Sequence, residues 1–385
     1  VNNEGILGGD GEVVLTGTSA QSISGGGSLE NLRLDNPTSL DFTDPADLFG
    51  VVYVDQGTLN TNGNLSLRCN FGTPGKTAQV GPVGGIIVGD VTVEQCYPAR
   101  RAFRFLSPSV TTATSIRENW QENPVGYMDN PSPGYGTHIT GVSPGSANAS
   151  VGQDGNNGFD YNPSGNASMF TFDNVGRIWN SISGTNVPLT AGTAYRLLVR
   201  GDRGIDIASN ASVPTDTRLR ATGELVIGTS TQSSLGSNNV NFIGNPYQAQ
   251  VNMIDLIAGS TNISPTQYYV WDPTLGGLPT PGLSGGRGGY VTVEPPTGAN
   301  TTSSLDNESL QRMQVDFVTT TGTASVTFEE SYKAVGEIQT DVKSNSVQEY
   351  INIQLFNANS FAQGETPSDG LRINFNKSFS VTTTD

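Results

Sequence analysis

The segment LENLRLDN, residues 29–36, contains the alternation Leu32-x-Leu34 and ends in an asparagine. This spacing places apolar side chains on one face of a β-strand. Short strands of the same kind, punctuated by glycine or asparagine, recur at 12–18, 50–54, 57–63, 65–69 and 86–93. Such strands are typical of a parallel β-helix, in which each coil buries one face against the next. An ordinary β-sandwich predicts similar strands but not the near-repeated turns, so we predict a β-helix-like solenoid over 1–96.

Two further regions follow the solenoid, and both have strand patterns. Residues 97–335 alternate polar and apolar residues in longer, more aromatic strands, which predicts a β-sandwich-type module. Its exceptions are two short helical patterns, at 114–121 and 251–258, and a long loop near 122–168 that is rich in Pro, Gly and Asn. Residues 336–385 contain too few strands for a domain and look like part of a further β-module. The predicted fold class is therefore all-β.

Cys69 and Cys96 are the only cysteines, and both fall in or at the end of predicted solenoid strands. Adjacent parallel strands lie about 4.8 Å apart, a distance that a disulfide can span. If the interval between the cysteines is one coil, the pair could bridge neighbouring coils in an oxidising compartment. The alternative is two separate small core residues, and the sequence leaves both open.

The net charge of the chain disfavours two classes of binding partner. The formal charge of −16 opposes both the phosphate backbone of nucleic acid and an anionic membrane surface. No stretch approaches the roughly 20 apolar residues of a membrane span. Strand-like patterns are interrupted at both ends, so we expect the chain to be part of a longer protein.

Several strings after the solenoid resemble one family. They are GDVTVE at 89–94, RRAFRFLSP at 100–108, GYGTHITG at 134–141, YRLLVRGDR at 195–203, GNPYQA at 244–249 and YYVWDP at 268–273. In this order they resemble the large surface proteins of Bacteroidota that are exported by the type IX secretion system. The resemblance runs from about residue 85 to the end and also fits the β-helix-like start.

The resemblance implies export and an extracellular or cell-surface location, and it implies no particular catalytic activity. In one respect the chain departs from the family pattern. Such proteins normally end in a C-terminal sorting domain, and none is visible before Asp385. Cleavage after export, or a longer chain, would account for this difference.

Few residues are suited to catalysis or metal binding. His138 is the only histidine, so Ser-His-Asp or Cys-His catalysis would have to use it, and we expect a structural role instead. Asp154, Asn156 and Asp160 place oxygen ligands around glycines, which faintly resembles a calcium loop. That loop lacks the closing Glu, so a plain turn competes with calcium, and we predict no other cofactor.

Three aromatic residues, Tyr268, Tyr269 and Trp271, could form a stacking platform for a glycan, although such residues more often belong to the core. The tripeptide Arg200-Gly201-Asp202 matches the integrin-recognition motif, but after a strand it is better explained as a turn with local charge pairing. Paired carboxylates for glycoside hydrolysis need defined separations that a sequence does not reveal.

These features predict a non-catalytic, surface-exposed structural or adhesive protein. Self-association into a filament or surface layer, or binding to other surface proteins, fits a β-rich chain of this kind. Two alternatives remain at this point. One is a carbohydrate-binding module that uses the aromatic platform, and the other is an accessory region of a larger secreted hydrolase.

Overall fold

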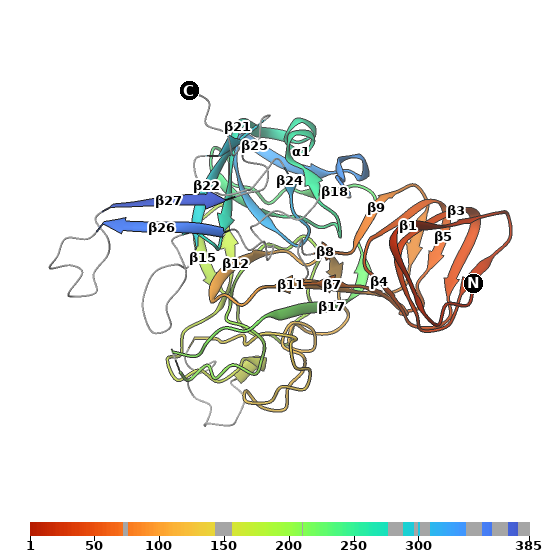
Figure 1. The fold of residues 1–385 in the computed structure, drawn as a ribbon. Coiled ribbons are helices and arrows are strands. Elements are labelled where there is room, and N and C mark those ends of the chain that lie inside the picture. The colour runs from red at the N-terminus through yellow and green to blue at the C-terminus, as the bar shows by residue number, and fades with distance from the viewer. Residues whose placement is uncertain are drawn as a thin grey trace. The chain divides into compact units, whose positions relative to one another are not determined.

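The computed structural model describes residues 1–71, 76–142, 156–209, 211–275, 288–295, 299–300, 309–335, 349–355 and 369–375. Within these ranges the chain is almost entirely β, as the sequence predicts (Figure 1). Its contacts divide it into two compact units, Val1–Ser344 and Asn345–Asp385. The first unit contains both the N-terminal strands and the sheets that follow them.

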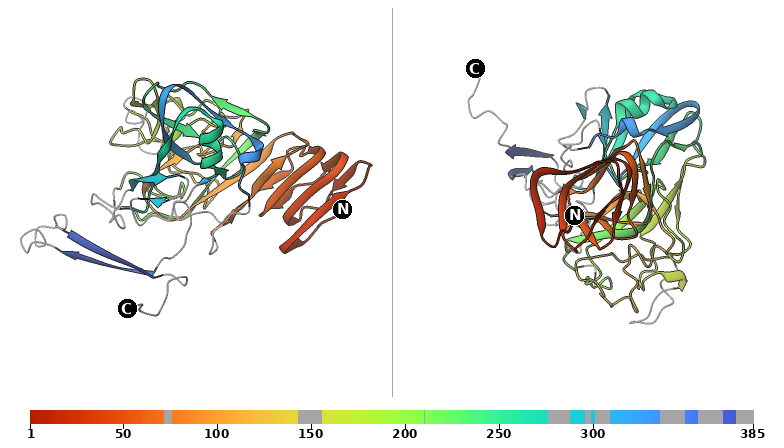
Figure 2. Two further views of the ribbon diagram at one scale, coloured as in Figure 1. Left: turned by 90° about the horizontal axis from the view of Figure 1, so that it is seen from above. Right: turned by 90° about the vertical axis from the view of Figure 1, so that its right-hand side faces the viewer.

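The predicted solenoid is confirmed and makes about three turns, whose stacked coils are visible in Figure 2. Its strands pair in parallel along three faces. They are β1 (Ile6–Thr16), β2 (Gln21–Ile23), β3 (Ser28–Phe42), β4 (Ala46–Leu48), β5 (Val51–Asn60), β6 (Leu65–Leu67), β9 (Gln79–Val83), β10 (Ile86–Val88) and β11 (Val91–Tyr97).

Aligned apolar rows fill the interior of the solenoid. One row contains Leu29, Leu48, Leu67 and Val93, one residue from each successive coil, paired through β3, β4, β6 and β11. None of the four is more than 2% exposed. Burial of a side chain of this size contributes roughly 1.5–3 kcal/mol, so the rows hold the coils in register.

Asparagines satisfy polar backbone groups where coils meet. The Asn31 side chain donates to the Gly11 carbonyl and accepts from the Val51 amide, at 3.1 and 2.9 Å, and so links three coils. Asn62 and Asn64 both donate to the Phe42 carbonyl in the preceding coil. Buried backbone groups need such partners, which explains why asparagine is common at these turns.

Strand β11 belongs to both the solenoid and the module that follows. One edge of β11 pairs in parallel with β6, and the other pairs antiparallel with β17 (Thr217–Leu225). Val93 therefore has Leu67 on one side and Ala221 on the other. All three are buried in one continuous core.

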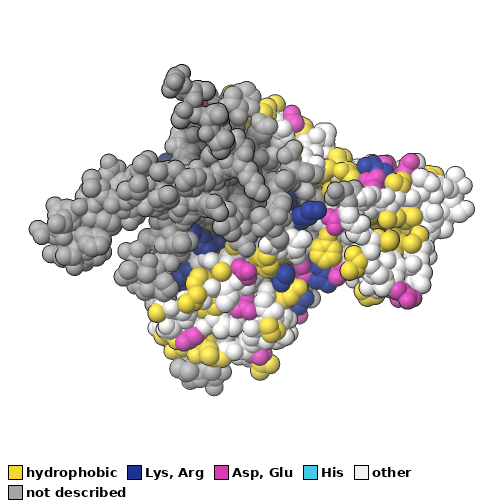
Figure 3. Space-filling view, in the orientation of Figure 1, with side chains coloured by type: hydrophobic (Ala, Val, Ile, Leu, Met, Phe, Trp, Pro, Cys, Tyr) yellow, Lys and Arg dark blue, Asp and Glu magenta, His cyan; other side chains and the backbone are white. Residues whose placement is uncertain are grey.

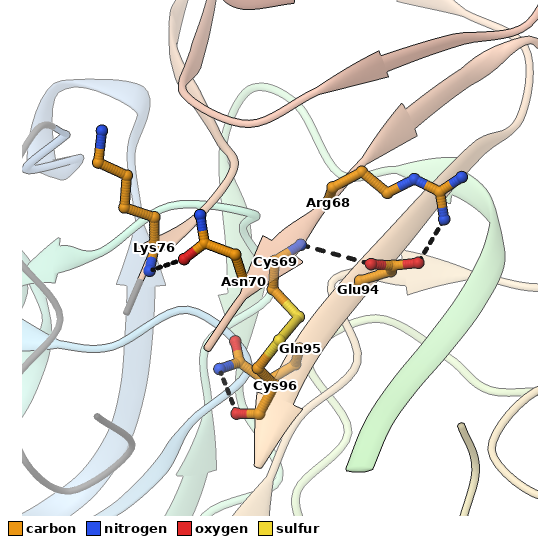
Figure 4. The surroundings of a disulfide bond; sticks show 7 residues. All are labelled: Arg68, Cys69, Asn70, Lys76, Glu94, Gln95 and Cys96. Carbon is orange, nitrogen blue, oxygen red and sulfur yellow. Dashed lines mark hydrogen bonds and ion pairs between the residues drawn. A yellow bond between two sulfur atoms is a disulfide. The ribbon is translucent and has the colours of Figure 1, made fainter. Parts of the chain in front are cut away.

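Two kinds of cross-link reinforce this junction. A disulfide joins Cys69 to Cys96 with a Cα–Cα distance of 5.7 Å (Figure 4). Beside it, Arg68 pairs with Asp47 in the preceding coil and with Glu94 of β11. On the side of the molecule drawn in Figure 3, basic and acidic side chains of the described residues are intermixed.

Two facing sheets form the body of the module. A four-stranded sheet has the order β12 (Ala102–Leu106), β16 (Tyr195–Val199), β14 (Met169–Asp173), β15 (Ile178–Ser181). A six-stranded sheet contains β18 (Ser230–Gln232), β19 (Val240–Gly244), β21 (Thr261–Asp272), β22 (Gly289–Glu294), β23 (Ala299–Asn300) and β25 (Val315–Phe328).

The two sheets meet across one group of rings, which we call the aromatic cluster. It consists of Phe105, Phe172, Trp179, Phe242, Tyr269, Trp271, Tyr290 and Phe317. Phe105 of β12 lies 5.0 Å from Phe242 and 5.9 Å from Phe317 between ring centroids. Edge-to-face aromatic pairs contribute about 0.5–1.5 kcal/mol beyond their burial. The predicted β-sandwich-type packing is therefore present.

Short elements complete this unit. They are β7 (Cys69–Asn70) with β8 (Lys76–Thr77), β13 (Val110–Thr111) on β17, β20 (Val251–Asn252) with β24 (Ser309–Leu310), the helix α1 (Met253–Gly259), and the 3-10 turns η1 (Asn156–Gly158) and η2 (Glu330–Tyr332). The helix expected at 251–258 is thus present from Met253, where the Asn252 side chain caps it. The helix expected at 114–121 is wrong, because those residues form successive turns.

The second unit contains a two-stranded antiparallel sheet. Its strands are β26 (Glu349–Leu355) and β27 (Asp369–Phe375). The alternating strand patterns at 350–356 and 371–375 of the sequence predict this pair. Whether it opens a larger β-module stays a prediction.

The Cys69–Cys96 disulfide closes a loop with a sequence separation of 27. The length of this loop determines the expected contribution of the disulfide to the free energy of unfolding. The change Cys69→Ala together with Cys96→Ala should lower the free energy of unfolding by about 3 kcal/mol, because it restores chain entropy to the unfolded state. Urea unfolding followed by tryptophan fluorescence measures this difference. Reduction of the wild-type protein should shift the midpoint equally, and an unchanged midpoint in both experiments would contradict the stabilising role.

Candidate functional site

The described chain contains a fully buried ion pair between Asp160 and Arg203. The guanidinium of Arg203 donates to both carboxylate oxygens, at 2.7 and 2.8 Å. Neither residue is more than 1% exposed. The same carboxylate accepts from the Gln121 side chain and the Ile139 amide, each at 3.0 Å. Such bidentate, fully hydrogen-bonded geometry is what a buried ion pair requires.

The only histidine belongs to this group. His138 is 3% exposed, and its Nε2 lies 3.1 and 3.0 Å from the carbonyls of Arg203 and Ile205. Two carbonyl acceptors mean that Nε2 carries a hydrogen and donates. The other nitrogen, Nδ1, lies 3.3 Å from the Asp160 carboxylate. Both nitrogens therefore face the interior, and the ring links the loop at 138 to the chain at 203–205.

The charge state of Asp160 follows from two opposing effects. Burial, the larger single effect, favours the neutral form and raises its pKa. The contact with the His138 ring and the hydrogen bonds from Arg203, with the attraction to the Arg203 guanidinium, together outweigh burial and lower the pKa to about 2. The carboxylate is therefore ionised at neutral pH and serves as the anionic centre of the ion pair.

This arrangement corrects the calcium prediction for Asp160. A guanidinium occupies the position where a cation would sit, because Arg203 contacts both carboxylate oxygens. Asn156 starts the exposed turn η1, and Asp154 lies outside the described residues. Among the described residues, no group of three or more His, Cys, Asp or Glu side chains is placed to hold a metal ion.

The predicted glycan platform divides between the two faces of β21. Tyr268 is 1% exposed and packs in the core on one face. Tyr269 and Trp271 lie on the other face, within the aromatic cluster. Trp271 stacks on Phe105 at 5.2 Å and donates from Nε1 to the Phe103 carbonyl at 2.8 Å. The three rings therefore do not form one exposed platform.

The motif at 200–202 contains a bend at Gly201 and Asp202, and a turn begins at Asp202. Gly201 has a φ of +136°, which favours glycine. The Asp202 carboxylate accepts from the Gly134 amide at 2.7 Å and from the Thr215 hydroxyl at 3.0 Å. The local charge pairing expected for Arg203 is replaced by its contact with Asp160, which is 43 residues away in sequence.

A groove that the sequence analysis missed lies between the two sheets of the module. Its volume is about 420 Å³, within the usual range for ligand pockets. Its lining residues are Thr171, Phe172, Asn174, Ala191, Gly192, Thr193, Ala194, Ser230, Thr231, Gln232, Ser233, Ser234, Leu235 and Phe242. No ionisable side chain is among them. The run STQSS at 230–234 is the only sequence signal, and its composition is common throughout this chain.

Local contacts shape the floor of this groove. The Gln232 side-chain nitrogen donates to the carbonyls of Gly244 and Gly192, at 2.6 and 3.4 Å. A Cβ on Gly244 would lie 2.5 Å from the Gly192 carbonyl, so the close approach of the two segments requires glycine there. Phe172 and Phe242 complete the floor with ring centroids 6.1 Å apart.

Comparison with known proteins identifies no relative. No family model matches the chain, and neither a curated protein nor a solved structure is significantly similar to it. Among the described helices, none is long and apolar enough to cross a membrane. The function must therefore be argued from the structure and the sequence themselves.

Asp160 gives a pH-dependent prediction. Its pKa falls from about 3.9 in an unfolded chain to about 2 in the fold. The stabilisation is therefore complete above about pH 5 and is lost as the pH falls from about 4 to 2. At pH 7, Asp160→Asn should cost about 3–5 kcal/mol, because Arg203 remains buried without its counter-charge.

Urea unfolding of wild type and Asp160→Asn across this pH range tests the prediction, and the difference between them should shrink toward pH 2. Asp90→Asn is the matched control. Asp90 is exposed, and its carboxylate forms no ion pair with any described residue. A difference that stays constant with pH would mean that Asp160 is not the titrating group.

Trp271 gives a second prediction. Trp271→Ala should lower the free energy of unfolding by about 3 kcal/mol, the lower end for a core tryptophan because the ring is only half-buried. Trp271→Phe should cost about 1 kcal/mol, since it mainly removes the hydrogen bond to Phe103. Thermal unfolding measures both changes. An alanine variant of wild-type stability would contradict the packing role and favour a ligand-binding one.

Proposed function

We propose that this chain is an exported, surface-exposed protein with a structural or adhesive role and no catalytic activity of its own. The observation that carries the proposal is the shared strand β11. Through it the sandwich-type module is built directly onto the end of a β-solenoid. A stalk joined to a larger module by continuous backbone pairing suits a protein that displays a binding surface and bears load.

The covalent link supports the proposed location. Disulfides persist in oxidising compartments and are rare in the reducing cytosol. The Cys69–Cys96 bond joins β7 to β11. Export through an outer membrane, as the resemblance to the type IX-secreted surface proteins implies, would place the chain in such an environment.

The state of the ionisable groups supports a non-catalytic role. The single histidine is oriented by two backbone carbonyls inside the fold. Arg203, Arg220 and Arg68 each pair with a buried carboxylate. These groups cross-link the structure, and charges in such pairs are poorly placed to transfer protons to a substrate.

Self-association is part of the proposal. Three apolar side chains on β1 are well exposed, with Ile6 at 84%, Val14 at 46% and Leu7 at 44%. Exposed apolar residues on a strand favour pairing with another chain. The formal charge of −16 spaces crowded copies apart and keeps them soluble.

The test combines an adhesion assay with a measurement of mass. Purified protein should bind immobilised polysaccharides or fixed bacterial cells, or form assemblies detectable by light scattering and electron microscopy, and it should release no product from them. Ile6→Lys together with Val14→Lys should reduce assembly, because charge on this strand opposes pairing. The matched control is Thr92→Lys, an exchange on the outer face of β11.

A protein that stays strictly monomeric and adheres to none of these surfaces would contradict the proposal. Turnover of any polysaccharide in the assay would contradict its non-catalytic part. Labelling of intact native cells by an antibody to residues 1–335 tests the location. Labelling that appears only after permeabilisation would place the protein inside the cell.

A further inference from the structure

The groove between β14, β18 and β19 is a hollow of ligand size whose chemistry the described fold leaves unused. Among the described residues, the hydroxyls of Thr171, Ser233 and Ser234 have no hydrogen-bond partner. Gln232 uses only its nitrogen, so its Oε1 is also available within this part of the chain. Donors and acceptors therefore line a space of about 420 Å³.

The walls of this groove exclude several ligand classes. An anionic ligand needs cationic side chains, and a metal ion needs carboxylate or imidazole ligands. None of the described lining residues supplies either group. A purely apolar ligand would leave the hydroxyls and amides of the wall without partners, which is costly. The suitable ligand is neutral and carries many hydroxyl groups.

The floor adds an apolar contact. Phe172 is half-buried, so part of its ring faces the groove, and Phe242 supports it from below at 3% exposure. The CH faces of a sugar ring pack against aromatic rings, while its hydroxyls bond to Ser, Thr and Gln side chains. One aromatic floor with polar walls matches both properties of a pyranose.

The floor is also built to hold its shape. Gln232 fixes the segment at 191–194 to strand β19 through its two carbonyl contacts. Asn174 holds the opposite side, since its side chain accepts from the Phe242 amide at 2.7 Å and donates to the Phe242 carbonyl at 3.3 Å. Pre-formed sites lose less entropy on binding.

We propose that this groove binds a neutral oligosaccharide. The inference rests on the proposed adhesive function and names its ligand class. It also moves the glycan contact away from Tyr268, Tyr269 and Trp271, which lie in the core and the aromatic cluster. The net negative charge of the chain also favours a neutral ligand, because it repels anionic polysaccharides.

The experiment measures binding of the whole chain to neutral oligosaccharides of glucose, xylose and mannose by calorimetry, with hyaluronan and polygalacturonate as charged comparators. At least one neutral oligosaccharide should bind with an affinity insensitive to salt. Thr171→Trp and Ser233→Trp fill the groove and should each weaken binding by about tenfold or more, a change of about 1.4 kcal/mol. Phe172→Ala should weaken it similarly by removing the floor.

Ser237→Trp is the matched control, since Ser237 is exposed in the same loop but does not line the groove. It should change the affinity by less than about twofold. Thermal unfolding identifies any variant that fails to fold. The two tryptophan variants alter half-exposed or exposed positions, so they keep the test valid if Phe172→Ala proves unstable.

Three outcomes would overturn the inference. They are no binding to any neutral oligosaccharide, binding only to the charged comparators, and binding that the groove variants leave intact. If the groove variants still adhere in the surface assay, the adhesive function stands and only its ligand class is wrong. If the wild type neither adheres nor assembles, the proposed function itself fails.

Discussion

The pairing of β11 constrains the whole of the first unit. A parallel solenoid ends in a strand with one open edge, and such an edge invites uncontrolled association. Here β17 covers that edge by antiparallel pairing over seven residues, from Val91 to Tyr97. The direction of the backbone changes at this point, and the core stays continuous across it. A load on the module would reach the coils through the hydrogen bonds of β11 and the disulfide at Cys96.

The buried ion pair has a comparable role within the module. The described parts of the long loop near 122–168 contain isolated bridges and the turn η1 but no strand, and they pack around Asp160 and His138. Arg203 extends the group, since its Nε donates to the Asp129 carbonyl at 3.2 Å. One carboxylate thus positions segments that local sequence would leave without fixed structure. The desolvation cost of burying the ion pair is offset because the Asp160 carboxylate accepts hydrogen bonds from Arg203, Gln121 and the Ile139 amide.

Sequence predicted features that depend on local periodicity. The Leu32-x-Leu34 alternation and the asparagine turns repeat from coil to coil, so the solenoid followed from them. The spacing of the two cysteines left pairing open, and register decided it. Tyr268 and Trp271 show where such reasoning ends. They are expected on one platform, whereas strand alternation puts them on opposite faces, and packing against other elements covers both faces.

The groove could not be predicted, because its parts are distant in sequence and chemically ordinary. Thr171, Gly192 and Gln232 come together only when two sheets pack. Polar neutral residues at these positions look like any other surface of a chain with 48 glycines and few charges. Their significance comes from what surrounds them. In a protein where four described arginines, Arg33, Arg68, Arg203 and Arg220, pair with acids, a ligand-sized hollow without any charge is a selective environment, and it favours ligands that hydrogen-bond without being ionised.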